Sequence, residues 1–453
     1  MIRPDQISGR SENAPRVSFY TLGCKLNYAE TSTMARDFEA HDFEVTPFGT
    51  AADVTVINTC TVTEEAERKC RQVIRRARRA NPEAFIVVTG CYAQLRPETI
   101  AAIPGVDAVL GAQEKFRLFD VLGDFSRGEQ TQVAVSCIDE AAAFGPAYSS
   151  GERTRAFLKV QDGCDYTCAF CTIPLARGRS RSHPLEPTLA QAREIAERGY
   201  REIVLSGVNI GLYGQEHGLT LLDLLRGLER IDGIERCRIS SIEPNLLTDE
   251  IIDFVAASDT FQPHFHLPLQ SGDDYVLGKM RRRYRRARYA DRVARIKERM
   301  PHACIGVDVI VGFPAETEER FENTYRFLND LPVSYLHVFT YSERPNTVAV
   351  ERLDALGGTP VPKPERARRN KMLRILSEKK RLAFYREHLG TVRPVLWEGD
   401  EKDGWMHGFT DNYVRVRRPF DPAFDGRLTD TRLAALAPDG SVEAEDAAFV
   451  PLL

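Results

Sequence analysis

Short runs rich in β-branched and aromatic residues alternate with helical patterns along most of the chain, and this alternation constrains the fold more than any other feature. In the first part, such runs lie at residues 17–24, 52–60, 84–91 and 106–112, with helical patterns between them. This order is typical of a parallel sheet with helices on its faces. We therefore predict an N-terminal parallel α/β domain over residues 15–127.

A second set of alternating patterns follows. Its strand patterns lie at residues 155–161, 201–208, 236–244, 264–271, 304–314 and 335–342. Six β/α units in about 190 residues fall short of a full eight-unit barrel, which needs about 250. We predict an open, partial (β/α)6 TIM-like barrel over residues 153–381, with the chemistry in the loops after its strands. Residues 128–152, rich in Gly, Ser and other small residues, are predicted to be a linker.

The last part of the chain has a different pattern. Residues 382–453 contain short alternating apolar and polar runs separated by Gly, Asp and Asn. These predict a small antiparallel β-barrel. A basic helical pattern at residues 362–389 leads into it.

Composition restricts the class and compartment of the protein. Hydrophobic residues make up 43% and charged residues 28% of the 453 residues, which excludes wholesale disorder. The formal net charge of −4 gives no general attraction to nucleic acid, so any such site must come from local clusters. No apolar run approaches the roughly 20 residues that span a bilayer, and the N-terminus lacks the apolar segment of a secretory signal. We therefore expect a cytoplasmic protein without a membrane partner, whose ten cysteines serve metal binding, redox chemistry or packing.

Three cysteines form a closely spaced motif directly after the first strand pattern of the second set. The segment GCDYTCAFC places Cys164, Cys168 and Cys171 in a C-x3-C-x2-C spacing. A structural zinc site needs four ligands, and the nearest downstream candidate is His183. An iron–sulfur cube bound by three cysteines leaves one iron open to another ligand, which suits catalysis. The alternatives are zinc and three unrelated thiols.

Three further cysteines, Cys24, Cys60 and Cys91, each end a predicted parallel strand of the N-terminal domain. The carboxyl ends of parallel strands meet at one edge of a sheet, where open α/β folds bind ligands. Three thiols that meet there can hold a second cluster with an open iron. The alternative is that they are buried packing residues, since a free cysteine packs as a small hydrophobe. The other four cysteines, Cys70, Cys137, Cys237 and Cys304, match no ligand position and are expected to be packing or surface residues.

The segment GCDYTCAFCTIPLARGRSRS at residues 163–182 resembles the cluster motif of radical S-adenosylmethionine (SAM) enzymes. The resemblance implies that Cys164, Cys168 and Cys171 hold a 4Fe–4S cluster whose fourth iron binds the amino and carboxylate groups of SAM. It also implies that Phe170 packs beside the adenine of SAM.

The arrangement as a whole, from TLGCKLNYAET to the C-terminal barrel, resembles the methylthiotransferase family. That family combines an N-terminal α/β domain carrying three scattered cysteines, a radical SAM core and a C-terminal TRAM domain. The motifs TLGCKLN, PLARGRSRS and GVNIGLYG are most similar to the enzymes that act on N6-threonylcarbamoyladenosine in tRNA. The resemblance therefore implies a second 4Fe–4S cluster on Cys24, Cys60 and Cys91.

The loops at the strand ends of the partial barrel supply further candidate contacts to SAM and substrate. The family contacts the SAM amino group in a segment that matches Ser206-Gly207-Val208-Asn209 here. Candidates at the ends of the next two strands are Ser241, Glu243, His266 and Gln270. Each could instead be a satisfied core polar residue or a turn residue.

Three basic clusters stand out in this net acidic chain, at residues 71–79, 279–288 and 366–381. Charge runs are usually solvated faces, but three of them together favour a polyanion surface beside the active site. The C-terminal barrel would add an RNA-binding surface like that of OB-fold proteins, formed by Tyr413, Arg415, Arg417 and Arg418.

We therefore predict a tRNA methylthiotransferase that converts the C2–H bond of N6-threonylcarbamoyladenosine at tRNA position 37 to a methylthio group. The predicted cofactors are two 4Fe–4S clusters and SAM, and the predicted partners are the tRNA anticodon stem-loop, a low-potential electron donor and a sulfur donor. The nearer alternative is methylthiolation of another tRNA adenosine or of a ribosomal protein side chain. The farther alternative is a non-catalytic zinc and RNA-binding module.

Overall fold

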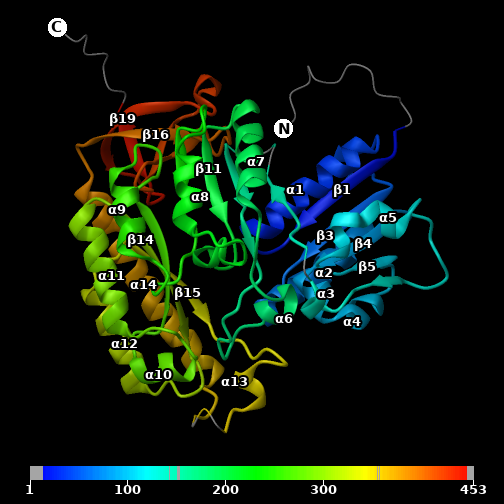
Figure 1. Cartoon of the computed structure of the whole chain (residues 1–453), viewed down its shortest axis with the longest axis horizontal. Helices are drawn as coiled ribbons and strands as arrows, with labels where there is room; N and C mark the ends of the chain where they lie inside the picture. The colour runs from blue at the N-terminus through cyan, green and yellow to red at the C-terminus, as the bar shows by residue number, and fades with distance from the viewer. Residues whose placement is uncertain are drawn as a thin grey trace.

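The computed structural model describes residues 14–445 apart from 142, 150, 152, 153, 355 and 357. An N-terminal sheet domain, a central partial barrel and a closed C-terminal barrel follow one another along the chain (Figure 1). The predicted fold class is confirmed. Residues 446–453, at the end of the predicted C-terminal domain, lie outside the described residues.

The N-terminal domain is built on a parallel sheet, with helices packed on both faces (Figure 1). The order of its described strands is β2-β1-β3-β4-β5-β6, and all their pairings are parallel. The strands are β1 (Arg16–Thr21), β2 (Glu44–Thr46), β3 (Val54–Thr59), β4 (Phe85–Gly90), β5 (Ala108–Leu110) and β6 (Gln132–Ala134). The helices are α1 (Lys25–Ala40), α2 (Glu64–Ala80), α3 (Cys91–Leu95), α4 (Pro97–Ala101) and α5 (Leu118–Leu122). The central strands β3 and β4 are buried along their whole length, which explains their runs of apolar residues.

Two strands of this sheet were not predicted. Both β2 and β6 are three-residue strands at opposite edges of the sheet, too short to show a strand periodicity in the sequence. The segment predicted as a linker contributes β6 to this sheet and β7 (Ala147–Tyr148) to the central domain, where β7 pairs antiparallel with β8.

The central domain contains six successive parallel strands within its described residues, at the predicted positions. They are β8 (Arg155–Lys159), β11 (Glu202–Ser206), β12 (Arg236–Arg238), β13 (His264–Gln270), β14 (Cys304–Val311) and β15 (Tyr335–Thr340). Parallel bridges Cys237–Phe261 and Ser241–His266 join the β12 side to the β13 side. A short antiparallel pair, β9 (Gln161–Asp162) and β10 (Arg181–Ser182), flanks the cysteine loop.

Helices cover the outside of this partial barrel (Figure 1). They are α6 (Ile173–Arg177), α7 (Leu185–Glu197), α8 (Leu221–Leu228), α9 (Asp249–Ala257), α10 (Asp274–Lys279), α11 (Arg286–Arg299), α12 (Glu318–Asp330), α13 (Val348–Glu351) and α14 (Lys363–Glu387). The 3-10 helices within the described residues are η2 (Glu114–Arg117), η3 (Ile138–Glu140), η4 (Ile210–Leu212), η5 (Gln215–His217) and η6 (Pro422–Phe424). The predicted basic helix is α14, and it leads into the C-terminal barrel.

The C-terminal domain is a closed barrel whose described strands run in the order β16-β17-β18-β20-β19. The strands are β16 (Val392–Trp397), β17 (Trp405–Thr410), β18 (Arg415–Pro419), β19 (Leu428–Leu436) and β20 (Val442–Glu445). The pairing is antiparallel as predicted, except that β18 pairs with β20 in parallel.

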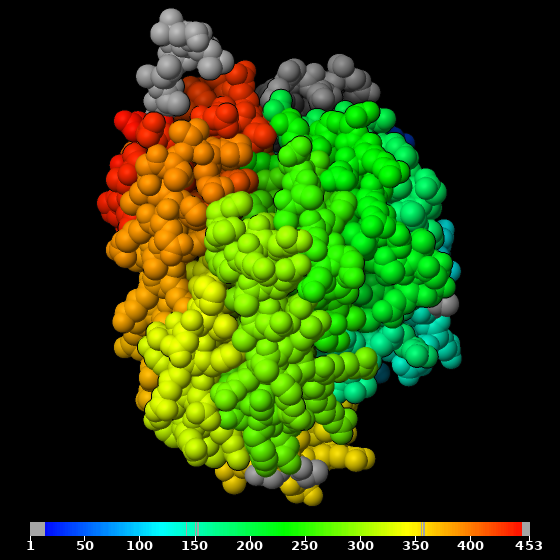
Figure 2. All heavy atoms as spheres, turned by 60° about the vertical axis from the view of Figure 1, so that its left-hand side comes forward, coloured from blue at the N-terminus to red at the C-terminus, as the bar shows by residue number. Residues whose placement is uncertain are grey.

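The C-terminal barrel rests directly on the central domain (Figure 2). Two buried arginines of β12 reach into it. Arg236 donates to the carbonyl of Phe409 at 3.0 Å, and Arg238 donates to the carbonyl of Thr410 at 2.7 Å. These charge-assisted bonds fix the barrel at the amino ends of the central strands. Among the described residues, no helix is long and apolar enough to cross a bilayer.

Candidate active site

The C-x3-C-x2-C cysteines lie in the loop between β9 and α6, at the carboxyl end of the partial barrel. Backbone N–H groups point at two of the sulfurs, with Tyr166 N 3.4 Å from Cys164 Sγ and Ile173 N 3.4 Å from Cys171 Sγ. Burial raises the pKa of Cys164 to about 11 and that of Cys171 to about 12. Three half-buried thiols with N–H donors to sulfur form a donor set that suits an iron–sulfur cluster.

The side chain of Arg282, which follows α10, contacts the cysteine loop and is not available to bind RNA. Its guanidinium is buried, with Nη1 3.1 Å from Cys168 Sγ and Nη2 bonded to the Glu243 carboxylate. The basic cluster at residues 279–288, predicted to bind a polyanion, includes Arg282, and for this residue the prediction is wrong. A run of cations shows local charge but not which side chain folds inward.

A cavity of about 300 Å³ opens beside these cysteines. Six of the predicted contact residues line it, namely Phe170, Val208, Asn209, Ser241, Glu243 and Gln270. Phe170 also packs edge-to-face on Phe313, with ring centroids 6.5 Å apart, so it is a cavity residue and a core residue at once.

Several polar atoms in this cavity wall lack a partner within the described chain. Asn209 is only 3% exposed, yet neither its Nδ2 nor its Oδ1 atom has a hydrogen bond. The same is true of Oε1 of Gln270, whose backbone has a φ of 69°. Buried polar groups are normally satisfied, so the wall is built for a polar ligand.

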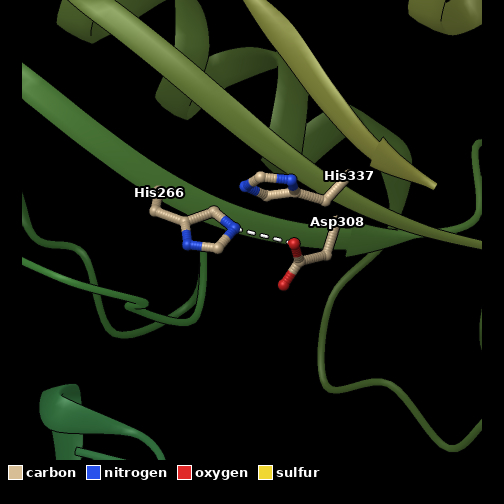
Figure 3. Close-up of side chains that lie close together, drawn as sticks. All are labelled: His266, Asp308 and His337. Atoms are coloured by element: carbon tan, nitrogen blue, oxygen red, sulfur yellow. Dashed lines mark hydrogen bonds and ion pairs between the residues drawn. The ribbon is translucent and has the colours of Figure 1, made fainter. Parts of the chain in front are cut away.

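The remaining predicted contacts, Ser206, Gly207 and His266, are not among the described residues that line this cavity. Ser206 is buried and donates to the carbonyl of Val204, and Gly207 packs against Gln161 and Ile210. His266 Nδ1 lies 3.2 Å from Ser241 Oγ. On the other side of the ring, His266 Nε2 lies 2.7 Å from Asp308 Oδ1 (Figure 3). His266 therefore orients Ser241 and does not itself line the cavity.

The second cysteine triad gathers at the carboxyl edge of the N-terminal sheet. Cys24 follows β1, Cys60 follows β3 and Cys91 follows β4, and these three strands are neighbours in the sheet. Gly23 permits the approach, because a Cβ there would lie 3.1 Å from Cys60 Sγ, and its φ is +110°. Burial and the neighbouring Cys91 raise the pKa of Cys60 to about 12. Three thiols that share one edge form a second donor set of the same kind.

The two triads share one region of the molecule. Val62 and Thr63, just after Cys60, line the cavity that contains Cys164, Cys168 and Cys171. Arg344, which follows β15, fixes this turn by donating to Thr61 Oγ1 at 3.1 Å and by pairing with Glu67.

A buried ion network sets the spacing between the triads, and no local sequence pattern predicts it. Glu30, on the helix that follows Cys24, lies 2.9 Å from Arg177 on the helix that follows Cys171. Lys115 and Lys159 also bind Glu30, at 2.6 and 2.9 Å. Burial alone would raise the pKa of Glu30, but these three cations hold it well below its ordinary value.

Comparison with known proteins decides the family. Residues 158–328 match the model described as the radical SAM superfamily, and residues 16–111 match the model described as uncharacterized protein family UPF0004. The chain is 40% identical over 412 residues to the threonylcarbamoyladenosine tRNA methylthiotransferase MtaB of Bacillus subtilis, covering 88% of this chain and 89% of that protein. It belongs to the radical SAM methylthiotransferase family.

Other members of the family are similar over most of their length. An MtaB of Aquifex aeolicus is 40% identical, with 89% of this chain and 96% of that protein covered. A tRNA-2-methylthio-N(6)-dimethylallyladenosine synthase of Wolinella succinogenes is 34% identical, with 91% and 95% covered. Among solved structures, the radical SAM methyltransferase TsrM of Kitasatospora setae shares the fold at a TM-score of 0.57 and 16% identity, over 75% of this chain and 76% of that one.

As a radical SAM methylthiotransferase, this protein uses SAM and a 4Fe–4S cluster. Cys164, Cys168 and Cys171 provide a donor set that suits this cluster, and the cavity beside them is lined by polar groups without a partner among the described residues. The family assignment removes the support for a non-catalytic zinc module. The other four cysteines are placed as expected, since Cys70, Cys237 and Cys304 are buried and Cys137 is exposed.

Replacing Asn209 by leucine is expected to weaken SAM binding. The unpaired amide of Asn209 is the wall group with most unused hydrogen-bonding capacity, and loss of a bond to a charged ligand lowers affinity on the order of tenfold or more. Equilibrium SAM binding to the cluster-loaded protein measures the effect. Asn329→Leu, at a position outside the cavity, is the matched control, and equal affinity in both variants would contradict a SAM contact at Asn209.

Proposed function

We propose that this protein methylthiolates C2 of N6-threonylcarbamoyladenosine at position 37 of tRNA, using a second 4Fe–4S cluster on Cys24, Cys60 and Cys91. The main observation in support of this proposal is that Val62 and Thr63, in the turn after Cys60, line the cavity beside Cys164, Cys168 and Cys171. One substrate atom can therefore meet both donor sets. The names of the MtaB relatives support the choice of nucleoside.

The residues of this chain perform binding, orientation and exclusion of water. The two clusters and SAM supply radical hydrogen abstraction and the sulfur and methyl groups when they are bound. Glu30 and Arg177 hold the two triads at a fixed spacing, while Arg282 donates to Cys168 Sγ and orients Glu243 in the cavity wall. An anticodon-loop base suits such a pocket because it is already unstacked.

The remaining partners and the compartment belong to the same proposal. A low-potential reductant must reach the cluster on Cys164, Cys168 and Cys171, and a sulfur donor must replace the sulfur that is transferred. Both would act in the cytoplasm, where tRNA is modified.

Mass spectrometry of tRNA nucleosides from a deletion strain tests the function. The expected result is loss of the 2-methylthio derivative of threonylcarbamoyladenosine, with its precursor accumulating. If that derivative is retained and the 2-methylthio derivative of dimethylallyladenosine is lost, the substrate is the other tRNA adenosine. If it is retained and a ribosomal protein loses its methylthio group, the substrate is a protein side chain.

The predicted RNA-binding arginines are Arg281, Arg282, Arg283, Arg285 and Arg286. Arg282 is buried and Arg283 lies over the Tyr166 ring at 3.9 Å, so the exposed Arg281, Arg285 and Arg286 form the candidate RNA surface. Within the described residues, no carboxylate forms an ion pair with them. Glu316 and Glu318 do not neutralise these arginines, because both pair with Arg369, at 2.8 and 3.1 Å. In the C-terminal barrel, Arg417 pairs with Glu443 and the Tyr413 ring stacks on His264 of the central domain, so these two predicted RNA contacts are engaged within the protein.

Changing Arg281, Arg285 and Arg286 together to alanine is expected to weaken tRNA binding and its dependence on salt. Each phosphate contact contributes about 0.7 to 0.9 to the log–log salt slope, so the slope should flatten by up to about two to three units. Binding titrations at several salt concentrations measure it. Arg326→Ala, on the outer helix α12, serves as the control; unchanged affinity and slope in the triple variant would move the RNA surface to another face.

A further inference from the structure

A second cavity, of about 330 Å³, lies where the three domains meet. Cys24 and Lys25 of the N-terminal domain line it, together with Arg155 and Arg238 of the central strands and Tyr413 of the C-terminal barrel. We call it the junction pocket. It is distinct from the cavity beside Cys164 but shares the edge of the sheet on which Cys24 lies.

Positive charge exceeds negative charge around the junction pocket. The buried Glu202 faces three guanidinium groups, those of Arg155, Arg236 and Arg238, at 3.9, 3.7 and 2.8 Å. Glu398 adds one carboxylate, 2.9 Å from Arg155. Three cations against two anions leave one positive charge before Lys25 is counted.

Lys25 adds a second positive charge without a counterion. In the described part of the chain its ammonium has no hydrogen bond or ion pair, and it lies 5.9 Å from the centroid of the Phe157 ring. Lys25 is exposed to solvent at the mouth of the pocket, and an ammonium group set beside other cations attracts an anion.

His264 provides an independent sign of a ligand. It lines the junction pocket, is 7% exposed, and stacks on Tyr413 with ring centroids 4.2 Å apart. Its Nε2 lies 3.0 Å from the Tyr335 hydroxyl, but its Nδ1 has no hydrogen-bond partner among the described residues. The pocket therefore presents an unpaired ammonium and an unpaired imidazole nitrogen side by side with two guanidinium groups.

We propose that the junction pocket binds the carboxylate and hydroxyl of the threonylcarbamoyl group and thereby selects the substrate nucleoside, an inference that rests on the proposed function. Cys24 in the pocket wall links the pocket to the second triad, so a base presented to that triad can direct its N6 substituent here. The carboxylate pairs with Lys25, and the hydroxyl suits the Nδ1 atom of His264. A neutral hydrocarbon substituent would leave these groups desolvated and unpaired, which a polar site rejects strongly.

Two anticodon stem-loop RNAs test this inference. One carries N6-threonylcarbamoyladenosine, and the other carries the same nucleoside with its carboxylate converted to a carboxamide. The ratio of kcat/KM for methylthio product formation on the two RNAs is the readout. Wild type is expected to prefer the acid by on the order of ten- to hundredfold, as for a charge-assisted bond in a partly desolvated site. Lys25→Gln should reduce this preference to less than about threefold, whereas Lys25→Arg should keep most of it.

Controls separate the possible outcomes. Iron content per chain reports whether the neighbouring Cys24 site is intact in each variant, and Lys363→Gln, an exposed lysine outside the pocket, should keep the wild-type ratio. A Lys25→Gln enzyme that keeps the wild-type preference would overturn the junction-pocket assignment alone. An equal loss on both RNAs would also overturn it, because Lys25 would then bind a backbone phosphate. If wild type forms no product on either RNA, the proposed function itself is wrong.

Discussion

Cys60→Ala and Cys91→Ala enzymes are expected to lose all methylthio product while still cleaving SAM reductively. The two triads lie in different domains, and the cavity that fits SAM is bounded by Cys164, Cys168 and Cys171. After anaerobic reconstitution, iron should fall from about eight to about four atoms per chain, since each cube holds about four. Iron analysis, 5′-deoxyadenosine formation and product mass spectrometry give the three readouts.

Cys137→Ala is the matched control for this experiment, because Cys137 is exposed and matches no ligand position. It should retain full iron and full product. If the Cys60→Ala protein keeps all its iron, then Cys24, Cys60 and Cys91 do not hold a cluster and are packing residues. A folded Cys91→Ala protein that no longer cleaves SAM would show that the two triads do not act independently.

Replacing Glu30 by glutamine is expected to destabilise the protein strongly and to lower product formation. Three buried cations, Lys115, Lys159 and Arg177, would lose their shared carboxylate. Breaking a buried ion network costs about 3–5 kcal/mol. For a chain of this size that corresponds to a fall of roughly 3–5 °C in the thermal midpoint if the chain unfolds as one unit. Differential scanning calorimetry measures the shift.

The stability difference between wild type and Glu30→Gln should depend on pH in a defined direction. The folded-state pKa of Glu30 is depressed by its cations, so its contribution is fully present above its ordinary value of 4.5 and is lost as pH falls through the depressed pKa. The gap between wild type and Glu30→Gln should therefore be constant near neutral pH and shrink only below 4.5. Glu65→Gln breaks an exposed pair with Arg68 and should cost less than about 1 kcal/mol. A Glu30→Gln protein as stable as this control would contradict the role of the network.

Most strands of the central domain were predictable because their segments are rich in apolar, β-branched or aromatic residues. The three-residue strand β12 was predicted only as part of a longer pattern, residues 236–244. The C-terminal barrel was predictable for a related reason, since its runs alternate with turn residues. Strands β2 and β6 were not, because three residues at a sheet edge carry no measurable periodicity. Ser206 and Gly207 do not line the cavity beside the cysteine loop, whereas Val208 and Asn209 of the same segment do, because strand position alone does not fix which residues of a loop face a cavity.

The sequence by itself determined the local chemistry: the spacing of Cys164, Cys168 and Cys171, and the position of Cys24, Cys60 and Cys91 at strand ends. Sequence spacing suffices there because strand ends in a parallel sheet meet at one edge whatever packs around them. Only the tertiary structure decided that Glu30 and Arg177, 147 positions apart, fix the two triads. It also turned Arg282 inward to Cys168 and joined Lys25, Arg238 and Tyr413 in one pocket. Those contacts join residues from different domains, and their free energy depends on burial and mutual distance, which no local pattern records.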